Sequence, residues 1–150
     1  MVPSDAFDLL RVPLPALPSA VLGAAVLAAE GVSLVLVGSA ALWLRGEIAS
    51  VADADVVIEP GEGNVLRLRE ALAGIAIGPV PSVDGFSSGS VVPVGTAYGK
   101  VDCLMERGRR DWERLRRNAG LLLVADVPVL VASSTDAWNL RRRHKERENE

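Results

Sequence analysis

Two aspartates two positions apart, and a third much later in the chain, are the residues of this sequence best suited to chemistry. Asp53 and Asp55 lie in the run VADADVVIEP, and Asp102 lies in the run GKVDCLM. Both runs are typical of β-strands, where side chains alternate between faces, so we expect Asp53 and Asp55 to point to the same side. If the second run pairs beside the first, three carboxylates converge and repel one another unless a cation lies between them. Hard divalent cations such as Mg²⁺ (or Mn²⁺) prefer oxygen ligands of this kind, and the pattern predicts a metal site.

A Gly-Ser pair ahead of the aspartates predicts a turn that binds an anion. The run SLVLVGSAALWLRG is typical of a strand, a turn at Gly38 and Ser39, and the start of a helix. A glycine lets a phosphate approach the backbone closely, and a helix N-terminus supplies free N–H groups and a partial positive charge. Ser39 adds a hydroxyl donor. Together with the aspartates, this turn predicts a site for a triphosphate, in which Asp102 completes the metal site or acts as a base toward an attacking hydroxyl.

Each of these features also has a plainer interpretation. A Gly-Ser pair after a strand is usually just a turn, a strand Asp-x-Asp is often surface decoration, and a lone Asp102 can pair with an arginine. The combination is more specific, because chain order, spacing and strand context agree. A strand as apolar as ADADVVIE has little structural reason to carry two acids on one face.

The elements that must position these residues alternate along the chain. A length of 150 residues favours a single domain over residues 1–150, and the alternation predicts mixed α and β structure in layers. The region 78–95 is interpreted as a loop with short strands, and the tail, about 143–150, as frayed. Hydrophobic periodicity and capping residues predict helices over 19–30, 40–45, 64–72 (N-capped by Asn64), 111–119 and from 136 onward, and strands over 32–37, 54–59, 99–105 and 127–132.

Composition sets the class of protein. Hydrophobic residues make up 49% and aromatic residues 4%, so the core must consist mostly of valine, leucine and alanine. The single cysteine, Cys103, excludes an intrachain disulfide, is expected to fill the core, and fits a reducing cytoplasm. The apolar stretch 12–29 is broken by Pro13, Pro15 and Pro18 and lacks a basic start, so it is interpreted as a buried helix and not as a signal or membrane segment. We therefore expect a cytoplasmic protein without membrane partners.

Charge is distributed unevenly along the chain. Residues 1–105 hold 5 Lys/Arg and 11 Asp/Glu, whereas residues 106–150 hold 11 Lys/Arg and 8 Asp/Glu. This division suits a polyanion held between a metal and arginines; for a charge run alone, a solvated basic helix is the better interpretation. The arginines that would meet phosphate or RNA, unless neighbouring acids neutralise them, are Arg107, Arg109, Arg110, Arg114, Arg116 and Arg117.

The stretch VGSAALWLRG…ADADVVI resembles the Gly-[Gly/Ser] … Asp-x-Asp signature of polymerase-beta-like nucleotidyltransferases. The flanking segments FDLL…EGVSLVLVGSAALWLRG, PGEGNVLRLREALAGI, TAYGKVDCLM and VPVLVASSTDAWNLRRRHKERE are similar to those of small bacterial nucleotidyltransferases related to abortive-infection and toxin–antitoxin enzymes. The resemblance covers nearly the whole chain. It implies an α+β fold of the polymerase-beta-like nucleotidyltransferase type, a mixed sheet flanked by helices in a single domain.

The resemblance also implies an activity. A nucleoside monophosphate would pass from an NTP to a hydroxyl of RNA, protein or a small molecule, with release of pyrophosphate, and a cognate toxin or antitoxin would be a partner. By position, the resemblance assigns the metal and the chemistry to Asp53, Asp55 and Asp102 with Mg²⁺ or Mn²⁺, the triphosphate to Gly38 and Ser39, and a further nucleotide contact on the closing helix to Arg141 or Lys145.

The chain departs from the family pattern at one place. The family often has an arginine and a threonine or serine shortly before the first aspartate, and here those places hold Ala49 and Val51, or Ser50 if the spacing slips. The alternative interpretation is therefore a degenerate nucleotidyltransferase-like module that binds a nucleotide or a partner without turnover. A third interpretation, a nucleic-acid-binding protein that uses the arginine-rich helix, predicts binding that depends steeply on salt.

Overall fold

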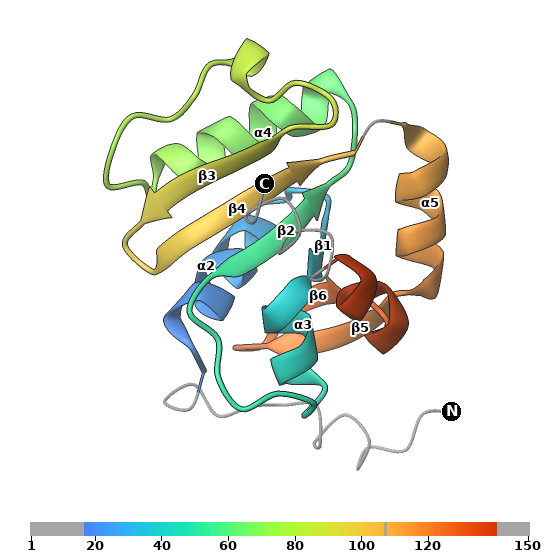
Figure 1. Ribbon diagram of the computed structural model, residues 1–150. Helices are drawn as coiled ribbons and strands as arrows, with labels where there is room; N and C mark the ends of the chain where they lie inside the picture. Colours follow the sequence, from blue (N-terminus) through green and yellow to red (C-terminus); the bar gives the residue numbers. More distant parts are fainter. Residues whose placement is uncertain (1–16, 107, 141–150) are drawn as a thin grey trace, which may run out of the picture.

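A mixed six-stranded sheet forms the centre of the computed structural model of the protein, which describes residues 17–106 and 108–140 (Figure 1). The strands are β1 (Leu34–Val37), β2 (Ala54–Ile58), β3 (Val91–Thr96), β4 (Gly99–Met105), β5 (Gly120–Val124) and β6 (Val127–Val131), in the spatial order β3-β4-β2-β1-β6-β5. The pairs β1/β2, β3/β4 and β5/β6 are antiparallel, whereas β2/β4 and β1/β6 are parallel. The predicted single α+β domain with a mixed sheet is confirmed.

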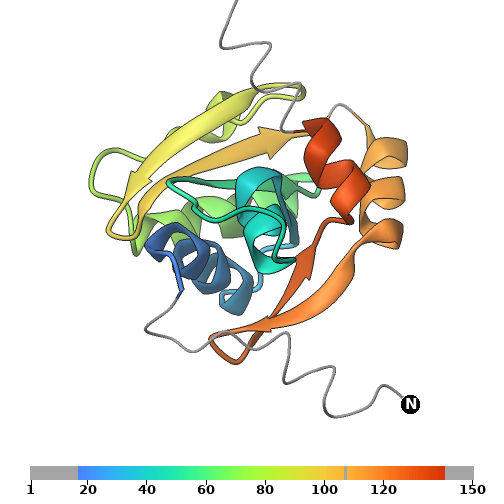
Figure 2. The same cartoon turned by 60° about the horizontal axis from the view of Figure 1, so that its bottom comes forward.

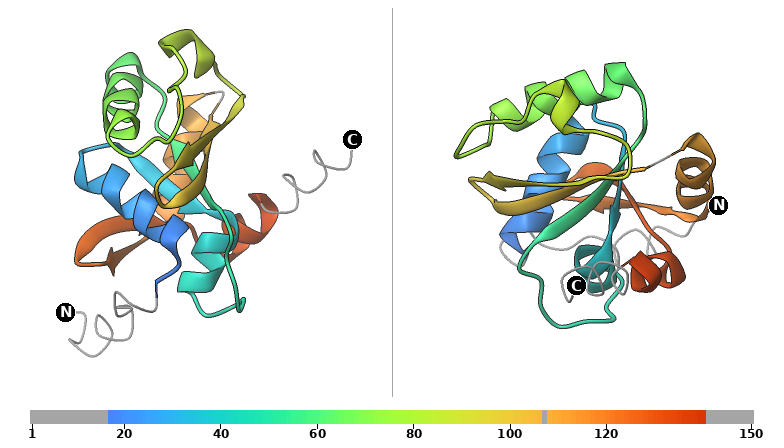
Figure 3. Two further views of the ribbon diagram at one scale, coloured as in Figure 1. Left: turned by 90° about the vertical axis from the view of Figure 1, so that its left-hand side faces the viewer. Right: turned by 45° about the horizontal axis from the view of Figure 1, so that its top comes forward.

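Helices cover both faces of this sheet (Figure 3). Two of them, α2 (Ser19–Ala29) and α4 (Glu62–Ala73), lie on one face, and α3 (Gly38–Leu44) lies on the other. A closing helix over residues 134–140 lies beside α3, as Figure 2 shows. The remaining described elements are α5 (Arg109–Asn118), which follows β4, and a short 3₁₀ helix, η2 (Val83–Gly85).

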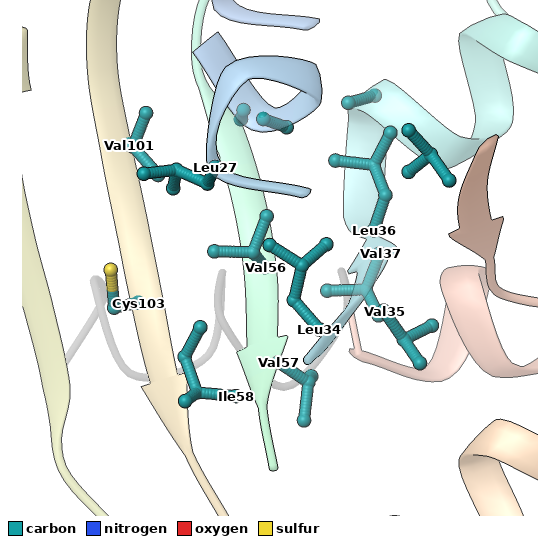
Figure 4. Packing of buried hydrophobic residues seen from close by; sticks show 14 of the residues in the cluster. Leu27, Leu34, Val35, Leu36, Val37, Val56, Val57, Ile58, Val101 and Cys103 are labelled. Atoms are coloured by element: carbon teal, nitrogen blue, oxygen red, sulfur yellow. The ribbon is translucent and has the colours of Figure 1, made fainter. Parts of the chain in front are cut away.

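Aliphatic side chains fill the space between α2 and the sheet (Figure 4). Leu27 of α2 and Val56 and Val101 of neighbouring strands are fully buried there, and Cys103 is buried in the same cluster, as the sequence predicted. Because side chains alternate along a strand, residues 55 and 102 point to the other face. The core thus determines which face of the sheet presents the acids. Within the described ranges, no helix combines the length and the apolar character that crossing a lipid bilayer requires.

Several helices begin about two residues before their predicted starts, and two further differences have a clear physical reason. The strand β5 was not predicted, because its hairpin to β6 turns at Ala125 and Asp126, both with positive φ (49° and 64°), and Ala-Asp is not one of the residue pairs that signal such a turn. Helix α4 begins at Glu62 and not at Asn64, so the assignment of Asn64 as an N-cap is wrong. The parts of the sequence predictions that concern residues 1–16, residue 107 and residues 141–150 lie outside the described residues.

Asn64 connects α4 to the sheet. Its Oδ1 accepts a hydrogen bond from the backbone N–H of Ser33 (2.8 Å), and its Nδ2 donates to the carbonyls of Ser33 (2.9 Å) and Glu59 (3.0 Å). The residue is 8% exposed, so water replaces these partners poorly if the amide is removed. Asn64 therefore fixes the backbone at Ser33, directly before the first residue of β1.

Replacing Asn64 with alanine is expected to lower the free energy of unfolding by about 2–3 kcal/mol, because three hydrogen bonds to backbone groups are lost in a largely buried place. The carbonyl of Ser33 keeps the backbone N–H of Glu59 as a donor (3.1 Å). Urea denaturation of Asn64→Ala measures the effect. The control is Asn118→Ala, which makes the same substitution at an exposed position at the end of α5. Equal stabilities of the two variants would contradict this role.

Candidate active site

Asp55 and Asp102 lie next to each other on adjacent strands. In the parallel pair β2/β4, Asp55 is the register partner of Asp102, and on its other side Asp55 pairs with Val37, the last residue of β1. The expectation that the strand of Asp102 pairs beside the Asp-x-Asp strand is confirmed. Asp102 is 2% exposed, which makes it one of the few buried charged residues among those described.

Asp53 is placed differently from the expectation. It precedes β2, which begins at Ala54, and its side chain is 45% exposed. The run VADADVVIEP led us to expect both aspartates on one face of a strand, but β2 starts at Ala54, as the predicted bounds 54–59 have it, and Asp53 lies just before it. The carboxylate of Asp53 instead contacts the ammonium group of Lys100, at 3.5 Å between Oδ2 and Nζ.

Lys100 was missed in the sequence analysis. It lies two residues before Asp102 on β4, and its Nζ is 3.6 Å from Oδ2 of Asp102 as well as 3.5 Å from Asp53. The spacing of two residues on a predicted strand was the signal that places Lys100 and Asp102 on one face.

The electrostatics of this cluster are unfavourable for a second charge at Asp55. Burial, followed by the charge and the hydrogen bond of Asp102 and by the charge of Asp53, raises the pKa of Asp55 to about 7, while the positive charge of Lys100 opposes the shift. The same acids, Asp102 first, raise the pKa of Lys100. Two adjacent carboxylates therefore share a site whose negative charge is incompletely balanced. Burial also raises the pKa of the Cys103 thiol to about 12, so this cysteine is no nucleophile.

The Gly-Ser turn lies against the same carboxylates. Gly38 follows β1 directly, adopts φ +60° and is the first residue of α3, and Ser39 follows it, half-buried. A Cβ atom at position 38 would lie 2.5 Å from Oδ2 of Asp55. Glycine is required here by the backbone conformation and by the approach of Asp55. Helix α3 thus begins at Gly38, two residues earlier than predicted.

Replacing Gly38 with alanine is expected to destabilise the fold by about 2–4 kcal/mol, because the left-handed backbone and the contact with Asp55 both carry a cost. The matched control is Gly46→Ala. Gly46 has φ +76°, and an added Cβ there meets no atom within 4 Å, so only the backbone cost of about 1–2 kcal/mol applies. Thermal or urea unfolding of both variants separates the two terms. Equal losses would show that Asp55 does not crowd position 38.

The donor chemistry at the cluster fits a hard divalent cation, but the three acids are not gathered around one point. Carboxylate oxygens are the ligands that Mg²⁺ and Mn²⁺ prefer. Burial, and after it the neighbouring acids, raise the pKa of Asp55, and a bound cation would oppose both effects. Within residues 17–106 and 108–140, however, no three acidic, histidine or cysteine side chains are arranged to hold a metal ion. Asp55 and Asp102 are the two adjacent carboxylates that suit a cation, whereas Asp53 forms an ion pair with Lys100.

The arginine-rich helix α5 lies by a different hollow. A cavity of about 400 Å³ is lined by Ser33, Glu59, Arg109, Trp112, Glu113, Arg116 and Arg117. Because Glu59 follows the end of β2 opposite to Asp53, this cavity is separate from the aspartate cluster. Arg109 is paired with Glu59 (2.9 Å) and with Glu113 (3.8 Å). Neighbouring acids thus neutralise part of the positive charge of α5, as expected for a solvated basic helix.

The tryptophans pack and do not form an exposed stacking surface. Trp112 of α5 is 1% exposed, and Trp43 and Trp138 pack against the core while partly buried. The indole N–H of Trp138 also donates to Glu47 (3.2 Å). All three tryptophans therefore serve the packing of the elements that carry them.

Comparisons with known proteins support the fold. No protein-family model and no curated protein matches the sequence. Among solved structures, the crystal structure of a putative nucleotidyltransferase from Thermotoga maritima matches with a TM-score of 0.59 and 14% identity, over 99% of this chain and 90% of that chain. The likeness at this identity is one of fold: the sheet and helices described above share their overall arrangement with that structure.

Proposed function

We propose that the protein is a nucleotidyltransferase that depends on a divalent metal and moves a nucleoside monophosphate from an NTP to an acceptor hydroxyl. The observation that carries the proposal is the pairing of Asp55 with Asp102, directly beside the Gly38 turn, in a fold shared with the structure of a putative nucleotidyltransferase. A structural role alone explains poorly why Asp102 should stand where its charge and hydrogen bond help burial to raise the pKa of Asp55.

The proposal gives each residue a task. Asp55 and Asp102, joined by Asp53, would hold Mg²⁺ or Mn²⁺, and Gly38 and Ser39 would contact the triphosphate. The metal, when bound, supplies positive charge against the charge that develops on the phosphate oxygens. Asp102 would also accept the proton of an attacking hydroxyl. Arg141 and Lys145 stay candidates for a further nucleotide contact on the resemblance alone.

The proposal leaves the acceptor open among three classes and includes a biological setting. RNA, a protein side chain and a small molecule all offer the required hydroxyl, and a toxin–antitoxin or defence setting with a cognate partner follows from the sequence resemblance.

The test uses NTPs labelled at the α-phosphate and, separately, at the γ-phosphate. Each is incubated with the protein, Mg²⁺, and cellular RNA or protein fractions. We expect label from the α-phosphate to enter one fraction and label from the γ-phosphate to enter neither, and EDTA to stop the transfer. Transfer of the γ-label, or transfer that ignores EDTA, would refute nucleotidyl transfer.

A second candidate is a module that binds nucleotide without turnover. It is favoured by Ala49 and Val51, where the family often has polar residues, and by the position of Lys100 between two of the acids. Calorimetry with each NTP, with and without Mg²⁺, separates the candidates. Nucleotide binding that is indifferent to Mg²⁺ would favour the module.

A further inference from the structure

Lys100 stands between two of the carboxylates that the proposed metal site requires. Its Nζ is 3.5 Å from Oδ2 of Asp53 and 3.6 Å from Oδ2 of Asp102. These distances describe one ammonium group shared by two acids that come from different segments, the approach to β2 and the strand β4. Lys100 thereby brings Asp53 to the cluster from outside the strand.

The position of Lys100 differs from that of an ordinary surface ion pair. Asp102 is almost fully buried, with 3% of its side chain exposed, whereas 44% of the Lys100 side chain is exposed. A buried carboxylate needs a compensating charge, and a half-exposed lysine supplies it from a flexible four-carbon stem. The ammonium can therefore leave toward solvent without unpacking the core.

We propose that Lys100 is a built-in counter-ion that occupies the place of the divalent cation, so that metal binding and release of Lys100 from Asp53 and Asp102 are coupled. This inference rests on the proposed function, because it takes the aspartates to be metal ligands. It accounts for two observations together. The three acids are not gathered around one point. Asp53 and Asp102, which come from different segments, both contact the ammonium group of Lys100.

The coupling has a measurable consequence. In the metal-free protein Lys100 offsets the repulsion among Asp53, Asp55 and Asp102, and a divalent cation must displace it. Removing the ammonium while keeping the length of the chain, in Lys100→Met, removes the competitor. The metal-free protein should then be less stable, and the affinity for metal should rise.

The experiment measures Mn²⁺ affinity by electron paramagnetic resonance, without nucleotide, at pH 8. We expect Lys100→Met to bind Mn²⁺ at least tenfold more tightly than the wild-type protein, and Lys100→Arg to bind as weakly as wild type. We also expect Lys100→Met to melt at a lower temperature without metal and to gain more from saturating Mn²⁺. The control Arg109→Met removes the same charge from a pair at the other end of β2 and should leave Mn²⁺ affinity unchanged.

The outcomes separate the two claims. An affinity of Lys100→Met equal to or weaker than that of wild type, while Asp55→Asn and Asp102→Asn lose Mn²⁺, would overturn the role of Lys100 and leave the metal site standing. Equal Mn²⁺ affinity of wild type, Asp55→Asn and Asp102→Asn would overturn the metal site, and with it the inference about Lys100.

Discussion

Asp102→Asn is expected to reduce metal-dependent nucleotide transfer by on the order of a thousandfold, because it removes one of the two adjacent carboxylates that would hold the cation, and charge stabilisation of this kind contributes several kcal/mol. Asparagine has nearly the same shape as aspartate, so the buried position 102 keeps its packing. The measurement is the initial rate of transfer from α-labelled NTP under saturating Mg²⁺.

The same variant should fold normally. Asp102→Asn removes one of two charges that oppose each other across β2 and β4, so its unfolding in EDTA should occur at the wild-type temperature or above. The control is Glu59→Gln, which removes a carboxylate at the other end of β2, paired with Arg109, and should leave the transfer rate unchanged. A rate for Asp102→Asn within a factor of two of wild type would refute the assigned role.

The second large effect concerns stability against pH in the metal-free protein. Burial and the neighbouring acids raise the pKa of Asp55 to about 7 in the folded state, from an ordinary value of 3.8, so the folded state binds the proton more tightly than the unfolded chain does. Its contribution is fully present below pH 3.8 and is lost as the pH rises through 7. We expect the free energy of unfolding to fall by about 2–4 kcal/mol from this group between pH 4 and pH 8 and then to level off.

The effect can be isolated by mutation. Hydrogen bonds from Ser134 and Ser33 lower the pKa values of Glu47 and Glu59, respectively. These two groups stabilise the fold when ionised, so their contribution to the free energy of unfolding falls as the pH becomes acidic, opposite to that of Asp55. A urea series in EDTA between pH 5 and pH 8.5 avoids most of that range. Asp55→Asn should be more stable than wild type at pH 8 and lack the downward slope. A wild-type stability that rises over this interval, or an unchanged slope in Asp55→Asn, would show that Asp55 titrates normally.

Much of the fold was predictable because local signals agree with tertiary structure. The β4 strand was predicted with its observed bounds, and α2 and β2 were predicted to within a residue. The exceptions are places where tertiary contacts override local signals. Asn64 resembles a helix cap but lies inside α4 and bonds to Ser33 and Glu59, and β5 depends on a turn whose residues give no signal for it.

The candidate site was predictable in its backbone and not in its side chains. The adjacency of Asp55 and Asp102 follows from two apolar strands that each carry an acid, and it is observed as a register pair. Gly38 was predicted for the approach of a phosphate, and the structure adds a second reason, the contact with Asp55. The long side chain of Lys100 can reach more than one acid, and no pattern of residue types specifies which carboxylates it contacts.

The most direct test of the central claim is the Mn²⁺ affinity of the double variant Asp55→Asn/Asp102→Asn beside wild type and the control Glu59→Gln/Glu113→Gln, which removes two acids that pair with Arg109. Paramagnetic resonance counts bound Mn²⁺ without requiring turnover or a known acceptor. We predict that wild type and the control bind Mn²⁺ alike and that the aspartate double variant loses this binding. Undiminished binding by the aspartate double variant would contradict it.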